Sequence, residues 1–153
     1  MIIGFTGTRE GMTHVQKVLV EKILKKYKPT GIVHGDCKGA DDEFHEIYVR
    51  YCKDLGKMKM GDWNIVLRPC DMNSMRAWCT NAVRIWTPRP PLVRNKDIVD
   101  TVDMVVACPK EPEEIVRSGT WSTIRYARRI KRPLIVVKPE KLIEMDNMEK
   151  FKV

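Results

Sequence analysis

The sequence has no apolar run of membrane-spanning length, no internal repeat and no low-complexity tract. Its five cysteines are widely spaced and include no C-x-x-C pair, which argues against a disulfide framework and against a zinc knuckle. The first residues, Met1 to Phe5, form a strand-like run without the charged segment and long apolar stretch of a secretory signal. We therefore predict a cytoplasmic protein with reduced thiols and no membrane partner, and we expect neither a metal ion nor a resident cofactor.

The length of 153 residues is typical of one domain, so residues 1–153 are predicted to form a single folding unit. Lys and Arg number 28 against 20 Asp and Glu, and the formal net charge of +8 favours encounter with anionic partners such as nucleotides or nucleic acids. The alternative is that much of this excess is a solvated surface that mainly affects solubility.

Short apolar runs rich in β-branched residues alternate with segments of helical periodicity. This alternation predicts an α/β, Rossmann-like fold, with a mostly parallel sheet of about five or more strands and helices on both faces. In such a fold, ligands bind beyond the carboxyl ends of the strands. The expected strands are 2–5, 31–34, 64–67, 104–108 and 134–137, and the expected helices are 15–27, a segment around 44–55, 92–102 and 120–130.

The loop after the first expected strand contains Thr6, Gly7, Thr8 and Arg9 and leads to a helix. A glycine that admits close backbone approach, an arginine and a helix N-terminus together favour a phosphate group. The alternative is an ordinary strand-to-helix turn in which Thr13 caps the helix.

The loop after the second expected strand holds Gly35, Asp36, Gly39 and Asp41. The glycines keep side chains out of a crevice, and Asp36 or Asp41 is placed to accept hydrogen bonds from sugar hydroxyls. For Asp41 we favour a helix cap. His34 and His45 flank this loop, but their separation of eleven residues matches no metal-ligand signature.

Two further segments lie near the same predicted edge. Arg94 and Asn95 begin the third expected helix and are expected to project into the same crevice; the alternative is that they form a solvated helix start. The second segment opens the last helix with small and hydroxyl-bearing residues that suit phosphate binding. Its residues are Arg117, Ser118, Gly119 and Thr120.

The secondary structure of two segments is not clear from the sequence. Residues 70–91 lack a clear period and are interpreted as a lid or an interface. Residues 138–153 are predicted to hold at most a short final helix.

Over most of its length, the chain resembles the SLOG superfamily, which joins the Rossmann-like domain of DNA-processing protein A (Smf) with the Lonely-guy phosphoribohydrolases. The loop segments 5–9, 34–41, 94–99 and 117–123 look like its motifs, the last of them like R-S-G-S/T-x-x-T. The resemblance points to small stand-alone members found in phages and bacteria, and it implies a homodimer.

One departure from the family bears on activity. Lonely-guy enzymes have a glutamate in the last loop, in P-G-G-x-G-T-x-x-E, and aligning Gly119 and Thr120 with its G-T places Thr123 at the glutamate. Catalysis of N-glycosidic cleavage would then require Asp36 or Asp41, with Arg94 or Arg117 near the sugar phosphate.

Three functions therefore follow from the sequence. The first is a nucleotide-binding module that senses or sequesters a nucleotide or nucleotide-derived molecule. The second is a nucleotide N-glycosidic hydrolase of the Lonely-guy kind. The third is a single-stranded DNA-binding protein, in which a basic groove follows the backbone and Trp63, Trp78 or Trp86 stacks on bases. For each tryptophan the alternative is core packing.

Overall fold

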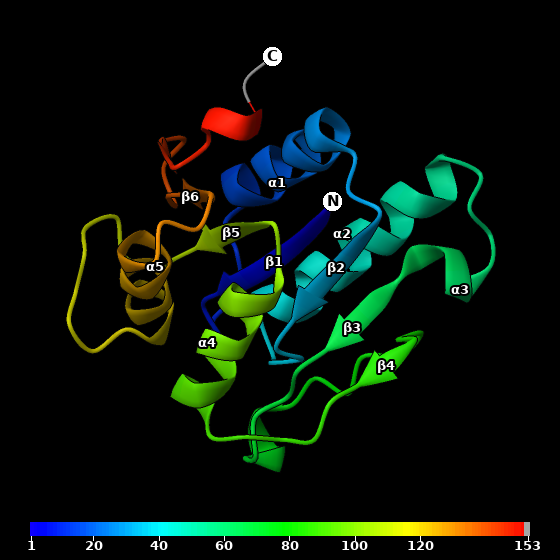
Figure 1. The fold of residues 1–153 in the computed structure, drawn as a ribbon, viewed down its shortest axis with the longest axis horizontal. Helices are drawn as coiled ribbons and strands as arrows, with labels where there is room; N and C mark the ends of the chain where they lie inside the picture. The colour runs from blue at the N-terminus through cyan, green and yellow to red at the C-terminus, as the bar shows by residue number, and fades with distance from the viewer. Residues whose placement is uncertain (152–153) are drawn as a thin grey trace.

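The strands form one seven-stranded sheet in the order β4-β3-β2-β1-β5-β6-β7 (Figure 1). The structure is a computed structural model that describes residues 1–151. Strands β1 to β6 pair in parallel, and β7 pairs antiparallel with β6. The α/β fold class with a mostly parallel sheet is thus confirmed. The strands are β1 (Ile2–Gly7), β2 (Gly31–His34), β3 (Ile65–Leu67), β4 (Arg84–Ile85), β5 (Met104–Cys108), β6 (Leu134–Val137) and β7 (Ile143–Asp146).

Helices cover both faces of the sheet (Figure 1). Helices α1 (His14–Tyr27) and α2 (Ala40–Asp54) pack together on one face, over a core that includes Phe5, stacked on Phe44. Helices α4 (Pro91–Thr101) and α5 (Gly119–Arg129) pack on the other face. Strands β5 and β6 are buried along their whole length, because both of their faces are covered.

The chain reverses its direction of travel across the sheet at β1. Strands β2, β3 and β4 follow on one side of β1, whereas β5, β6 and β7 follow on the other. The connections diverge between β1 and the neighbouring strands, and this divergence leaves a crevice at the carboxyl ends of an open α/β sheet. The fold therefore leaves a crevice where the loops after β1, β2 and β5 meet.

Thr13 caps α1 in a reciprocal arrangement with Gln16. The Thr13 hydroxyl accepts from the Gln16 N–H at 3.1 Å, and the Gln16 side chain accepts from the Thr13 N–H at 2.9 Å. The interpretation of Thr13 as a helix cap is therefore confirmed.

Several elements differ from expectation. The short helix α3 (Met60–Trp63) and the edge strands β4 and β7 were not expected. The C-terminal part contains β7 and, as the sequence allowed, a short final helix, which is a 3₁₀ helix at Glu149–Phe151; residues 152–153 lie outside the described residues. Within residues 1–151, no helix is both long enough and apolar enough to cross a bilayer.

Candidate functional site

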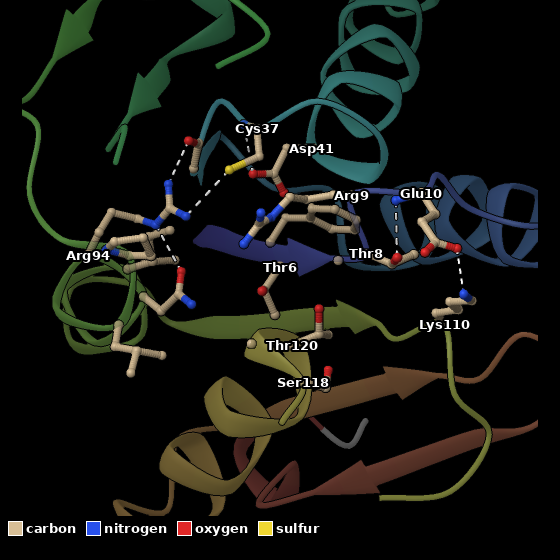
Figure 2. Close-up of a pocket in the computed structure, with 18 of the residues that line it drawn as sticks. Thr6, Thr8, Arg9, Glu10, Cys37, Asp41, Arg94, Lys110, Ser118 and Thr120 are labelled. Carbon is tan, nitrogen blue, oxygen red and sulfur yellow. Dashed lines mark hydrogen bonds and ion pairs between the residues drawn. The ribbon is translucent and has the colours of Figure 1, made fainter. Parts of the chain in front are cut away.

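A cavity of about 530 Å³ opens at the carboxyl ends of the central strands (Figure 2). Its wall brings together segments that are far apart in the sequence: the loops after β1, β2 and β5 and the first turns of α4 and α5. Twelve of the residues expected at a site line it: Thr6, Gly7, Thr8, Arg9, Gly35, Asp41, Arg94, Asn95, Arg117, Ser118, Gly119 and Thr120.

Arg94 is the buried cation of this cavity, with 6% of its surface exposed. Its Nη1 donates to the carbonyl oxygens of Gly35 at 2.6 Å and Arg68 at 3.0 Å, and its Nε donates to the Asn95 side chain at 2.8 Å. Nη2 lies 3.5 Å from the Cys37 sulfur (Figure 2). All of these hydrogen-bond partners are neutral, and the charged group near Arg94 is the Asp41 carboxylate, with which it interacts electrostatically.

Gly35 makes room for this arginine. A Cβ at position 35 would collide with the Arg94 guanidinium and would lie 2.9 Å from the Asp41 carboxylate. The absent side chain thus lets a cation and a carboxylate approach the same backbone segment.

Asp41 is the buried acid of the cavity. Its carboxylate accepts from the Cys37 N–H at 3.1 Å, so it ties the loop after β2 to α2. Burial raises the pKa of Asp41 from 3.8 to about 6, although the nearby Arg94 charge opposes this shift. The expectation that Asp41 caps α2 is wrong in detail, because Gly39 is the N-cap and Asp41 lies in the first turn.

Asp36 does not line the cavity and is fully buried. Its carboxylate accepts from Arg76 Nε at 2.9 Å and from the Cys79 N–H at 2.8 Å, and it forms an ion pair with Arg76 Nη2, also at 2.9 Å. These bonds attach the segment 70–91 to the loop after β2. The structure thus corrects the expected catalytic and sugar-binding role of Asp36, because both of its carboxylate oxygens are engaged away from the cavity.

Gly39 is also absent from the lining and supports the cavity from behind. It has φ +90, and an added Cβ would collide with the Arg9 backbone. Next to it, the Ala40 N–H donates to the Thr8 carbonyl at 2.9 Å, which fixes the loop after β1. Residues 11–14 do not line the cavity, so the N-terminus of α1 does not contribute to it as the sequence predicted.

The N-terminus of α5 faces the cavity instead. Ser118 is its N-cap and accepts from the Trp121 N–H at 3.1 Å, while Gly119 and Thr120 form the first turn at the cavity wall. The N–H groups of a first helical turn have no partner within the helix, so they favour an anion. Lys110 forms an ion pair with Glu10 at 2.6 Å. Within residues 1–151, the cavity residues Arg9 and Arg117 form no ion pair.

Sequence reasoning missed several lining residues. Cys37 lies within the second predicted loop, and burial raises the pKa of its thiol to about 11, so it stays protonated. Lys110 and Glu111 follow β5 after Pro109, and polar residues after a buried strand were the signal that could have identified them.

His34, His45 and Cys79 present donor atoms that lie within 4.8 Å of one another. The Asp36 N–H donates to His34 Nδ1 at 3.0 Å, so neutral His34 carries its proton on Nε2 and donates it to His45 Nδ1 at 2.9 Å. A histidine bound to a metal normally donates its second ring N–H outward, and here a backbone donor occupies that position. The cluster therefore fits a buried hydrogen-bond chain and does not fit a metal site, and burial lowers the pKa of His34 accordingly.

Thr123, which aligns with the Lonely-guy glutamate, is turned into the helix. Its hydroxyl donates to the Gly119 carbonyl at 2.9 Å, and the residue does not line the cavity. This position therefore supplies no acid or base to the cavity.

No protein-family model and no curated protein matches the sequence. Among solved structures, the chain is similar to the molybdenum cofactor binding protein from the phototrophic bacterium Rippkaea orientalis, with a TM-score of 0.64 and 17% identity over 98% of this chain and 81% of that one. It is also similar to TM1055, a structural genomics target, with a TM-score of 0.55 and 14% identity over 87% of this chain and 71% of that one. At these identities the likeness shows a shared Rossmann-like fold.

Proposed function

We propose that the protein binds a nucleotide or nucleotide-derived ligand, as a sensor or sponge, with a phosphate group held between the loop after β1 and the N-terminus of α5. The observation that carries the proposal is the cavity itself, where a helix N-terminus and the arginines Arg9, Arg94 and Arg117 surround one space. The resemblance to the SLOG superfamily supports a nucleotide, and the Rippkaea orientalis protein of this fold is a cofactor-binding protein. The same resemblance predicts a homodimer, which sedimentation of the purified protein would reveal.

The test is calorimetric titration with nucleoside mono-, di- and triphosphates. We expect at least one of them to bind, and we expect Arg9→Ala/Arg117→Ala to weaken that binding by about tenfold or more, because a hydrogen bond to a charged group contributes about 1.5–3 kcal/mol. The matched control is Lys22→Ala/Arg129→Ala, which removes the same charge from exposed positions on α1 and α5 that do not line the cavity. No binding by any nucleotide, or an equal loss in the control, would refute the proposal.

Asp41 favours a second candidate, hydrolysis of a nucleotide N-glycosidic bond. A carboxyl with a pKa of about 6 at the wall of the cavity can donate a proton near neutral pH. In this reaction, the carbon–nitrogen bond breaks as the base takes the proton that Asp41 supplies, water adds its oxygen to the anomeric carbon, and the proton that the water loses returns to the Asp41 carboxylate.

Chromatographic detection of free base separates the two functions. Hydrolysis predicts base release by the wild type and a loss of about a hundredfold or more in Asp41→Asn, as for removal of a general acid. If nucleoside monophosphates bind and remain intact at high protein concentration, the hydrolase mechanism is excluded and the binding function stands.

A further inference from the structure

A group of arginines around Trp86 lies beside the cavity and outside its lining. Arg84 places its guanidinium carbon 3.5 Å from the centre of the Trp86 ring, and Arg68 places its own at 4.3 Å. Arg89 follows three residues later. We define Arg68, Arg84, Trp86 and Arg89 as the arginine–tryptophan cluster.

The cluster continues the edge of the sheet on which the cavity lies. Arg68 directly follows β3 and Trp86 directly follows β4, and the Trp86 N–H donates to the Leu67 carbonyl at 2.9 Å. The Arg68 carbonyl accepts from Arg94, the buried cation of the cavity, at 3.0 Å. On the other side, Pro91 and Leu92, which line the cavity, follow Arg89 almost immediately. The cluster and the cavity therefore share a border.

The positive charge of the cluster is poorly neutralised. Within residues 1–151, its one ion pair joins Arg89 to Asp97 at 2.7 Å. Arg68 Nε is buried without a hydrogen-bond partner. Burial lowers the pKa of Arg68, and the charges of Arg84 and Arg89 lower it further, while Asp97 opposes the shift. An anion bound here would supply both the missing acceptor and the missing charge.

The tryptophan makes this arrangement suitable for phosphate. A guanidinium stacked on a ring is restricted in orientation, yet its in-plane N–H groups remain able to bind phosphate oxygens in a forked manner. Arg84 and Arg89 are exposed, so a ligand can reach them from solvent. Neighbouring strands lie about 4.8 Å apart, so the ends of β3 and β4 are about 10–15 Å from the end of β1. A single phosphate group cannot span this distance, whereas the long arginine side chains cover part of it and leave a gap that two phosphates joined through a nucleoside can bridge.

We infer that the arginine–tryptophan cluster is a second phosphate-binding site, and that the ligand of this protein carries two phosphate groups separated by a nucleoside, as in a dinucleotide or a short single strand. This inference rests on the proposed function, since the first phosphate occupies the cavity. It extends that function from one nucleotide to a phosphodiester-linked pair.

The experiment compares thymidine 5′-monophosphate, the 5′-phosphorylated thymidine dinucleotide and a single-stranded thymidine decamer at one fixed salt concentration, because such affinities depend on salt. We expect the wild type to bind the dinucleotide about tenfold or more tightly than the mononucleotide. Arg84→Ala/Arg89→Ala should abolish this gain and leave mononucleotide binding unchanged. Lys22→Ala/Arg129→Ala, which lowers the net charge equally, should retain the gain.

Each outcome decides the inference. If the mononucleotide binds and the dinucleotide gains nothing, or if Arg84→Ala/Arg89→Ala keeps the gain, the second site is refuted and the proposed function survives. If neither these thymidine ligands nor any nucleotide of the calorimetric series binds, both fail; if a nucleotide of that series binds and the thymidine ligands do not, the comparison is repeated with the mono- and dinucleotide of the base that binds. A decamer that binds no more tightly than the dinucleotide identifies a small dinucleotide as the ligand, whereas a further gain with the decamer identifies a nucleic-acid strand.

Discussion

The cavity has one wall that is fixed in place and one that is open to solvent. The loop after β2 is buried from Gly35 to Cys37, whereas most of the loop after β5, residues 110–117, is exposed, and Val116 is 86% exposed. The first loop is held by buried charges. The second is held by contacts at the surface, such as those from Arg125 to the carbonyls of Ile115 and Val116. We infer that the loop after β2 presets the shape of the cavity, while the loop after β5 adapts to a ligand.

The largest expected effect comes from breaking the buried ion pair behind the fixed wall. In Asp36→Asn, Arg76 keeps its charge without a carboxylate at a site where it is 8% exposed. Breaking a buried pair costs about 3–5 kcal/mol, and we expect a loss of that size in the free energy of unfolding, measured with urea.

The matched control for Asp36→Asn is Glu114→Gln in the open loop. It removes an exposed carboxylate that lies 3.2 Å from Arg125, and such pairs contribute about 0–1 kcal/mol. Equal losses in the free energy of unfolding of the two variants would show that the loop after β2 is held no more firmly than the loop after β5.

The second expected effect is a pH dependence that comes from the fixed wall. The folded-state pKa of Asp41, about 6, lies above its ordinary value of 3.8, so between these values the folded state binds the proton more tightly than the unfolded state does. The contribution of Asp41 to the free energy of unfolding therefore falls as the pH rises from about 4 to about 6, by about 3 kcal/mol in total.

Asp41→Asn should remove this part of the pH profile, seen as the difference between urea unfolding curves of the variant and the wild type at each pH. Glu114→Gln should keep the profile of the wild type. A profile for Asp41→Asn that runs parallel to that of the wild type would contradict the assignment of the shift to Asp41.

The smallest of the three expected effects is the loss of stability when alanine replaces one glycine at the end of each wall. Gly39→Ala places a side chain at φ +90 against the Arg9 backbone and should cost about 1–3 kcal/mol. Gly119→Ala, at the first turn of α5, meets no atom within 4 Å and should change stability by about 0.5 kcal/mol or less. Thermal unfolding of the two variants provides the measurement, and a Gly39→Ala protein as stable as Gly119→Ala would remove the basis for calling the first wall fixed.

Local patterns in the sequence were sufficient to predict most of the fold. Strands β2, β5 and β6 match their expected bounds because buried parallel strands are short, continuous apolar runs. Strand β4 escaped prediction because it is two residues long and both are exposed. Strand β7 escaped because Ile143–Asp146 is only partly buried and contains two acidic residues.

The residues of the site were predictable as a group, because the carboxyl ends of parallel strands meet at one edge. Their individual environments were not. The loop after β2 does not show that Asp36 binds Arg76, which lies 40 residues away. Likewise, Trp63, a candidate for stacking on bases, is buried in the core, while Trp86 lies against Arg84 of β4 and Arg68, which follows β3. Such pairings depend on tertiary packing, which the periodicity of hydrophobic residues along the sequence does not predict.

The position of β1 at the centre of the sheet also bears on how the protein reaches its native state. β1 pairs with β2 through Ile2 and Gly31, but it pairs with β5 through Ile3 and Met104, about a hundred residues away along the chain. Contacts between distant residues form slowly, because closing a long loop costs entropy before the contact forms. The half of the sheet from β1 to β4 should therefore assemble first, and the cavity, which needs both halves, should be among the last features to form during folding.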